Sequence, residues 1–363
     1  MKNSFGNYVS VTLFGESHGS QIGCVIDSVA PGIAVDEEEI ARALAARRPS
    51  GQYSTARRES DPFRIVSGVK DGFTEGTPLT LLIPNSDQHS SDYPDDAPVR
   101  PGHADFAARE KYHGFEDRRG GGHFSGRLTA ALVAAGAILN MALRQKGIVI
   151  GTHILRLAGL SDRPFSDPER EIPRLIHSPF PLLDETKREA MEAAILAAKE
   201  EGDSVGGILE TCVVGMPSGV GEPWFDSMES CLAHALFSVP AVKGVQFGLG
   251  FDAADRKGSE VNDAFYVENN TVRTRTNHNG GINGGITNGM PLVFSLAVKP
   301  TPTISKPQES VRIDSLESVT VASGGRHDPC IVHRAASVVN AVTAIVLYDV
   351  LTGRYGTDWF CER

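Results

Sequence analysis

Two long apolar runs constrain the fold of this chain more than any other feature. They occupy residues 128–143 and 335–351, and each follows a glycine-rich polar segment, "GGGHFSGR" at 120–127 and "SGGRHDPCIVHR" at 323–334. Helices that are apolar on nearly every side need cover all round, so we expect a central layer of buried helices between sheets. The first run, at about 16 residues, is shorter than the roughly 20 that cross a bilayer, which indicates a core helix.

The remaining pattern predicts an α+β fold. Amphipathic helices are expected at 36–48 and 184–201, and a shorter one at 225–237. Asp36 and Glu39 have the spacing of a capping box, and Gly202 is expected to end the second helix. Strand-like runs, several of them adjacent without an intervening helix, occur at 8–14, 22–29, 64–69, 78–83, 148–155, 205–215, 244–249 and 291–299.

The domain organisation is expected to be simple. No low-complexity linker divides the 363 residues, so we expect a single domain over 1–363. Long loops are expected near 84–125, 277–290 and 300–334. Loops of such length inside a compact protein are more often functional than idle, so we expect these to carry the active site.

Charge and cysteine content limit the class of protein. The formal net charge of -10 opposes broad binding to nucleic acid or to an anionic membrane surface. The five cysteines show no C-x-x-C spacing, and the metal-ligand spacings we considered are absent, so we expect neither a disulfide framework nor a metal site. The amino-terminal segment lacks the pattern of a signal peptide. A reducing cytoplasm is therefore the expected location.

Arginine is concentrated in one segment of this acidic chain. Residues 42–64 contain six arginines against two acids, Glu59 and Asp61. One interpretation is that these arginines collect a small anion, and the other is that they form a solvated basic face.

Two histidine-containing segments are candidates for proton transfer. "FGESHG" at 14–19 places His18 in a turn, where we expect it to be exposed and able to act as an acid or base; the alternative is that it only hydrogen-bonds its own loop. The segment 100–127 holds three histidines and many basic residues. Its Gly120–Gly122 backbone could approach an anion, and Ser125 could cap the following helix. We interpret the histidines as proton donors or hydrogen-bond partners rather than zinc ligands.

The segment before the second apolar run offers a third candidate. Asp328 stands between His327 and Arg334 at the entrance to a buried helix, an environment that shifts pKa values. The alternative is ordinary turn chemistry, because Asp before Pro is common in turns.

Six motifs, taken together, resemble the chorismate synthase family. They are "FGESHG", "RPGHAD", "GGG" before "SGRLTAALVAAGAI", "NGGITNG", "KPTPTI" and "GRHDPC", in the family's order and spacing and along essentially the whole chain. The resemblance implies a helical layer between antiparallel sheets, assembled as a cytoplasmic homotetramer. It also implies a carbon–oxygen lyase that converts a phosphorylated dicarboxylate, 5-enolpyruvylshikimate 3-phosphate, to chorismate by a formal anti-1,4-elimination.

The resemblance further implies a cofactor and roles for particular residues. Reduced FMN would lend an electron transiently and recover it, with NADPH needed to reduce the flavin directly or through another reductase. His18 would protonate the departing phosphate, His103 would help to hold the reduced, anionic flavin, and Asp328 would assist proton removal through the flavin N5. The implied substrate contacts are Arg47, Arg48, Arg100, Arg127 and Arg334. The implied flavin contacts are His123, Ser125, Ala241, Gly284, Lys299, Pro300, Thr301, Pro302, Thr303 and Arg326.

The chain departs from the common family pattern near the glycine-rich loop. His123 and Phe124 stand where many members have Arg and Ser, Leu128 and Leu132 stand where they have Glu and Arg, and Gln52 stands near another family arginine. These changes remove positive charge near the expected ligands. They motivate one alternative to the lyase, a non-catalytic flavin- or anion-binding relative. A second alternative is a phosphatase that uses the same anion pocket.

Overall fold

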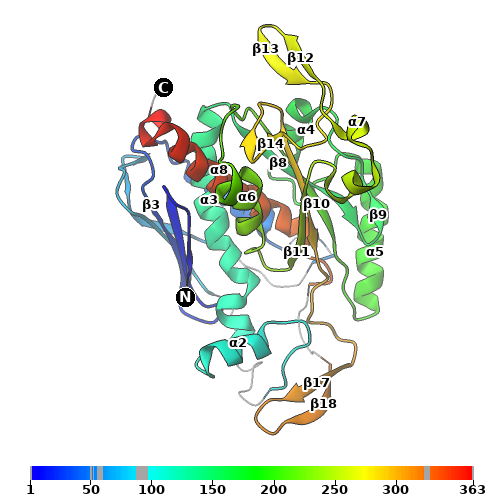
Figure 1. Ribbon diagram of the computed structural model, residues 1–363. Helices are drawn as coiled ribbons and strands as arrows, with labels where there is room; N and C mark the ends of the chain where they lie inside the picture. Colours follow the sequence, from blue (N-terminus) through cyan, green and yellow to red (C-terminus); the bar gives the residue numbers. More distant parts are fainter. Residues whose placement is uncertain are drawn as a thin grey trace.

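Two five-stranded antiparallel sheets enclose a layer of helices (Figure 1). The structure is a computed structural model that describes residues 2–49, 51, 53–54, 60–86, 97–322 and 328–361. The α+β architecture expected from the sequence, with buried helices between antiparallel sheets, is therefore confirmed.

The two sheets contain all eight predicted strands. The first sheet has the order β1-β2-β3-β7-β4 and the second β11-β16-β10-β8-β9. One edge strand of each sheet, β1 in the first and β9 in the second, has only two residues and was not predicted from the sequence pattern. The bounds in the first sheet are β1 Ser4–Phe5, β2 Ser10–Gly15, β3 Gln21–Asp27, β7 Leu79–Pro84 and β4 Arg64–Ser67. Those in the second are β11 Val242–Phe247, β16 Leu292–Val298, β10 Gly207–Val214, β8 Val149–Leu157 and β9 Leu160–Ser161.

The two apolar runs form the central helices α3 (Thr129–Gln145) and α8 (Val332–Tyr355). α3 packs against β3 and β7 of the first sheet, and α8 packs against β8 and β10 of the second. By length and composition both helices could cross a membrane, but most of each lies buried in this core. Cover on both sides by sheets explains why they are apolar nearly all round.

The central helices approach each other closely at one glycine. A Cβ atom on Gly136 of α3 would lie 2.4 Å from the Cα and the Cβ of Ala341 of α8. The backbones can meet here only because residue 136 has no side chain. This contact therefore permits the close packing of the two helices.

The helix α1 (Glu37–Arg47) corrects one prediction. The Asp36 carboxylate caps it as expected, accepting hydrogen bonds from the backbone N–H groups of Glu38 and Glu39 at 2.8 and 3.1 Å. The prediction of the reciprocal hydrogen bond to the Glu39 side chain is wrong. The Glu39 carboxylate instead accepts hydrogen bonds from Arg42 at 3.0 Å and from Arg144 of α3 at 2.7 Å. A tertiary ion pair outcompetes the local cap.

The other predicted helices are shorter than expected. The helix predicted at 184–201 begins as a 3-10 turn, Glu185–Lys187, and continues as α5 (Arg188–Glu200), with Gly202 following in the left-handed region at a φ of 70°. The helix predicted at 225–237 is α6 (Met228–Leu236). It packs against α8.

Several further short elements complete the fold. They are α2 (Asp105–Tyr112), α4 (Pro168–Leu175), α7 (Gly258–Val261), and the strand pairs β5 (Val69–Lys70) with β6 (Phe73–Thr74), β12 (Phe265–Glu268) with β13 (Thr271–Thr274), β14 (Ile282–Asn283) with β15 (Ile286–Thr287), and β17 (Gln308–Arg312) with β18 (Glu317–Val321). The expected loops are thus partly ordered into α2, β14–β15 and β17–β18. The β12–β13 and β17–β18 hairpins project from the body (Figure 1), so they lack the apolar periodicity that packing imposes.

The amino-terminal segment is fastened to α8 by one carboxylate. Asp349 accepts hydrogen bonds from the backbone N–H groups of Asn7, Tyr8 and Val9 at 2.7 to 3.1 Å. Because Asp349 is buried, these bonds hold the segment that contains β1 beside the central layer.

The close contact of α3 with α8 gives a first prediction. Gly136→Ala introduces a Cβ atom into a backbone contact, so it should destabilise the fold by about 1–3 kcal/mol, the usual cost of overpacking. Calorimetry should show a lower unfolding temperature. Gly258→Ala is the control, since no heavy atom lies within 4 Å of its added Cβ atom. Equal unfolding temperatures for the two variants would contradict this packing.

Candidate active site

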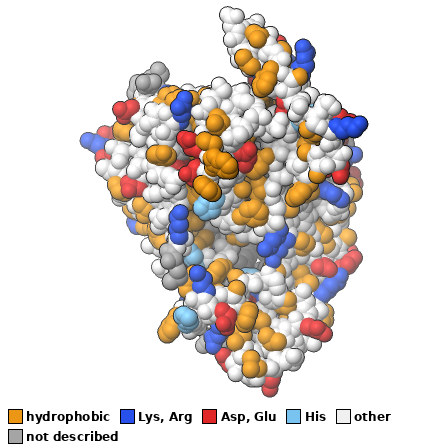
Figure 2. Space-filling model, in the orientation of Figure 1, with side chains coloured by type: hydrophobic (Ala, Val, Ile, Leu, Met, Phe, Trp, Pro, Cys, Tyr) orange, Lys and Arg blue, Asp and Glu red, His pale blue; other side chains and the backbone are white. Residues whose placement is uncertain are grey.

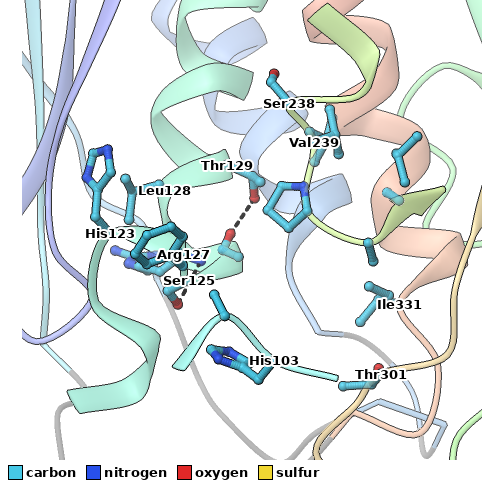
Figure 3. Close-up of a pocket in the computed structure, with 18 of the residues that line it drawn as sticks. His103, His123, Ser125, Arg127, Leu128, Thr129, Ser238, Val239, Thr301 and Ile331 are labelled. Carbon is cyan, nitrogen blue, oxygen red and sulfur yellow. Dashed lines mark hydrogen bonds between the residues drawn. The ribbon is translucent and has the colours of Figure 1, made fainter. Parts of the chain in front are cut away.

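A cavity of about 1210 Å³ opens where the central helices begin. The hollow appears in Figure 2 with basic and histidine side chains near it. In Figure 3, His103 and Thr301 lie below the cavity and Ser238 and Val239 lie above it. Segments that are distant in sequence therefore face one space.

Part of the cavity wall is apolar and part is charged. Leu132 of α3 and Val338 and Val342 of α8 contribute apolar surface. The residues implied by the family resemblance that also line the cavity are His18, Arg47, Arg100, His103, His123, Ser125, Arg127, Ala241, Lys299, Thr301, Pro302, Thr303, Asp328 and Arg334. The cavity is thus suited to a ligand with both anionic groups and a flat apolar surface.

Three of the implied residues that the structure describes do not contribute to this wall. Among the described residues, Arg48, Gly284 and Pro300 do not line the cavity. Arg48 instead donates a hydrogen bond to the backbone carbonyl of Ser60, and Gly284 lies in the turn between β14 and β15. Arg326 lies outside the described residues, as does Gln52.

The glycine-rich loop packs against two histidines. Gly120, Gly121 and Gly122 have φ values of 58°, 91° and 52°. A Cβ atom on Gly120 would lie 2.2 Å from Cε1 of His18, and one on Gly121 would lie 3.2 Å from Cε1 of His103. The three glycines therefore allow the backbone to approach both rings, in a conformation that other residues rarely adopt.

His18 differs from its expected environment. The sequence predicted an exposed turn, but His18 is buried, because the glycine-rich loop covers it. Its Nδ1 lies 3.1 Å from the Ser17 hydroxyl, which itself donates to the Arg119 carbonyl at 3.0 Å. Since the hydroxyl has one hydrogen and donates it to Arg119, Nδ1–H is the donor to Ser17.

Asp61 is the centre of the arginine cluster. Its buried carboxylate accepts hydrogen bonds from Arg47 at 3.0 Å and from Arg127, and lies 3.6 Å from Nε of Arg48. Burial would raise the pKa of Asp61, but the Arg47 and Arg127 guanidiniums hold it below its ordinary value. The arginines from two segments are thereby held together at the cavity wall.

The start of α8 joins the same cluster. Arg334 forms an ion pair with Asp328 at 2.5 Å, and its Nε donates to the backbone carbonyl of Arg47 at 2.8 Å. The structure therefore brings Asp328 and Arg334 together with the arginine-rich segment, although they are distant in sequence.

The start of α2 positions His103. Asp105 accepts two hydrogen bonds from the Arg100 guanidinium, at 2.8 and 2.7 Å, and a third from the Arg100 backbone N–H at 2.9 Å. Nδ1 of His103 lies 2.8 Å from the same carboxylate. Burial would raise the pKa of Asp105, but hydrogen bonds from Arg100 and His103 hold it far below its ordinary value.

The loop before α3 is held by two local contacts. Nδ1 of His123 lies 2.8 Å from the backbone carbonyl of Gly15, which requires the ring to donate through Nδ1–H. Ser125 accepts from the backbone N–H of Arg127 at 3.2 Å, so it caps the 3-10 turn that leads into α3 (Figure 3). The expected cap at Ser125 is thus present.

Sequence reasoning missed the residues that support these side chains. Asp61 was noticed only as an acid among arginines, and Asp105 and Ser17 only as parts of motifs. A signal for Asp61 existed, because an acid inside an arginine-rich segment has an evident partner. Its pairing with Arg127, 66 positions away, could not be inferred from spacing.

The fold and the cavity define an α+β protein with arginines and histidines around one cavity, an arrangement suited to an anionic ligand. The chorismate synthase family model matches residues 9–352. A chorismate synthase of Thermococcus gammatolerans is 47% identical over 352 residues, covering 96% of this chain and 97% of that protein. One of Archaeoglobus fulgidus is 44% identical over 350 residues, with the same shares covered.

Comparison with a solved structure supports the same family. A crystal structure of chorismate synthase has a TM-score of 0.77 and 31% identity, covering 97% of this chain and 94% of that one. This chain therefore belongs to the chorismate synthase family.

The buried ion pairs of Asp61 give a second prediction. Asp61→Asn leaves two guanidiniums without this counter-charge, so it should lower the free energy of unfolding at pH 7 by about 3–5 kcal/mol. The folded-state pKa of Asp61 is lowered, so its contribution is present above the ordinary aspartate pKa of about 3.9 and is lost as the pH falls through the folded value. The difference in the free energy of unfolding between wild type and Asp61→Asn should therefore become smaller below about pH 4.

Urea unfolding at a series of pH values measures this effect. Asp314→Asn is the matched control, because Asp314 pairs with Arg109 at 2.6 Å on the surface and should contribute less than about 1 kcal/mol. Equal losses in the two variants would show that Asp61 does not hold the cluster.

Proposed function

We propose that this protein converts 5-enolpyruvylshikimate 3-phosphate to chorismate, a step of the shikimate pathway toward aromatic amino acids. Membership of the chorismate synthase family supports this reaction. The observation that carries the proposal is the convergence of Arg47, Arg127 and Arg334 with His18 and His103 around one cavity. The substrate has two carboxylates and a phosphate, and the product has lost the phosphate and a ring hydrogen.

The electrostatics of the cavity suit such a substrate. Charge-assisted hydrogen bonds from arginine are worth roughly 1.5–3 kcal/mol each, and the planar guanidinium matches both carboxylate and phosphate. The amino-terminal ends of α3 and α8 also face the cavity, and their partial positive charges favour anions. Arg47, Arg127 and Arg334 are our assigned substrate contacts.

The residues at the cavity fit reduced FMN. The volume of about 1210 Å³ exceeds the roughly 300–1,000 Å³ of common small-molecule sites, so it accommodates a cofactor beside a substrate. Apolar surface from Leu132 and Val338 suits a flat ring system. Reduced FMN would supply an electron transiently, with no net redox change, and NADPH would reduce the flavin directly or through another reductase. The residues that would hold it are His123, Ser125, Ala241, Lys299, Thr301, Pro302 and Thr303.

Two residues would move protons. His18 would act as an imidazolium, giving its Nε2 proton to the departing phosphate while Nδ1–H stays bonded to Ser17. Asp328, held by Arg334 at 2.5 Å, would assist removal of the ring proton. Elimination needs both events, and the cavity offers an acid and a base from different segments.

We also infer a cytoplasmic homotetramer. Phe115, Trp224 and Phe225 are largely exposed, and exposed aromatic side chains are typical of protein interfaces. The net charge of -10 argues against nucleic acid or membrane as partners. Light scattering of the purified protein tests the oligomeric state.

One assay separates this function from its alternatives. Substrate is added anaerobically to the protein with reduced FMN, and chorismate and phosphate are measured. The lyase forms both only with reduced flavin. A non-catalytic relative would release no phosphate, and a phosphatase would release phosphate with oxidised flavin or none.

The role of His18 gives a third prediction. His18→Ala should lower kcat by about 10²–10⁴-fold, the usual contribution of a general acid, while FMN affinity changes little. Stopped-flow turnover and flavin titration measure the two quantities. His113→Asn is the control, because His113 ends α2 outside the cavity lining and Asn tolerates its left-handed backbone. Wild-type turnover in His18→Ala would remove His18 from the mechanism.

A further inference from the structure

His103 has two charged neighbours at Nδ1, and one requires this nitrogen to carry a proton whereas the other requires it to be unprotonated. Nδ1 of His103 lies 2.8 Å from the Asp105 carboxylate and 3.1 Å from the Arg100 guanidinium. The carboxylate can only accept a hydrogen bond from Nδ1–H, whereas the guanidinium can only donate to a bare Nδ1. One of the two contacts must determine the tautomer.

The geometry favours the contact with Asp105. Arg100 donates Nε–H and one of its two Nη2–H groups to the two oxygens of Asp105, so its guanidinium is oriented by a bidentate ion pair rather than by the ring. The distance to Asp105 is also the shorter of the two. Nδ1 therefore carries the proton and donates it to Asp105.

We propose that Asp105 is a positioning residue for His103: its carboxylate holds the proton of the neutral ring on Nδ1 and so presents Nε2 to the cavity. This inference rests on the proposed function, in which His103 lies beside the flavin. With Nδ1–H bonded to Asp105, Nε2 is the ring nitrogen that can contact a ligand.

The packing around His103 holds the ring in this orientation. A Cβ atom on Gly121 would lie 3.3 Å from Nε2, so the glycine-rich loop covers that edge of the ring closely. Lys299, at the end of β16, donates from Nζ to the backbone carbonyl of Gly102 at 2.6 Å and so fixes the turn that carries the histidine. The charged groups that face the ring from these elements are Arg100, Asp105, Glu116, Asp117, Arg118 and Lys299.

Among these groups, Asp105 and Arg100 contact the ring directly, and they favour different tautomers of the neutral ring. Asp105→Asn removes the carboxylate that accepts from Nδ1–H and leaves the Arg100 guanidinium as a donor to a bare Nδ1, which favours the Nε2–H tautomer. Arg100→Gln keeps the carboxylate, so the Nδ1–H tautomer should persist. A structural disturbance alone would not separate the two variants in this way.

Nuclear magnetic resonance of ring-labelled histidine in the flavin-free protein tests the proposal directly. For the neutral ring we expect the Nδ1–H tautomer in wild type and in Arg100→Gln, and a rise of at least about tenfold in the ratio of Nε2–H to Nδ1–H in Asp105→Asn, because the lost hydrogen bond is charge-assisted. Asp314→Asn is the matched control, because Asp314 pairs with Arg109 of α2 and should leave His103 unchanged. His103→Gln assigns the signal.

Turnover provides a second readout. In Asp105→Asn kcat should fall by about the same factor as the tautomer ratio changes, while the substrate KM stays within about twofold. An unchanged tautomer of His103 in Asp105→Asn, or the same change of tautomer in both variants, would overturn the proposal. If wild type forms no chorismate, the proposed function fails, but the tautomer of His103 still decides the role of Asp105.

Discussion

The contact of α3 with α8 at Gly136 and Ala341 is the constraint on which the rest of the structure depends. Both helices are apolar nearly all round, so each must be covered by the other and by a sheet. The polar residues at their amino-terminal ends, in 120–127 and 328–334, cannot enter that core and lie beside it at one cavity. The cavity is therefore a consequence of how the core packs, and the partial positive charge of two helix ends is directed toward it.

Carboxylates keep the positive side chains of the cavity in place. Arg47 and Arg127 share Asp61, Arg100 is paired with Asp105, and Arg334 with Asp328. Guanidiniums in buried positions need such partners, because an uncompensated buried charge is costly. The pairing also fixes direction, so that a ligand meets arginines that are already oriented. The histidines are likewise oriented by hydrogen-bond partners, His103 by Asp105 and His18 by Ser17.

The sequence predicts the parts of this protein that obey a local rule. Apolar runs and β-branched runs predict the central helices and all eight named strands, because burial imposes a period on the residues. The Glu39 half of the capping box fails since Arg144, 105 positions away, captures the carboxylate. The burial of His18 beneath Gly120, and the bond from Arg127 to Asp61, likewise depend on segments that meet only in the fold. The motifs identify which residues matter, and the structure shows what holds them.

The central claim is that the ends of α3 and α8 and the paired arginines form the site of the anionic substrate. A crystal structure of the protein with FMN and 5-enolpyruvylshikimate 3-phosphate tests it most directly. The account predicts anionic groups of the substrate in hydrogen-bonding contact with Arg47, Arg127 and Arg334, with Asp61 still bound behind them. A substrate whose phosphate and carboxylates all contact other residues, away from this cluster, would contradict it.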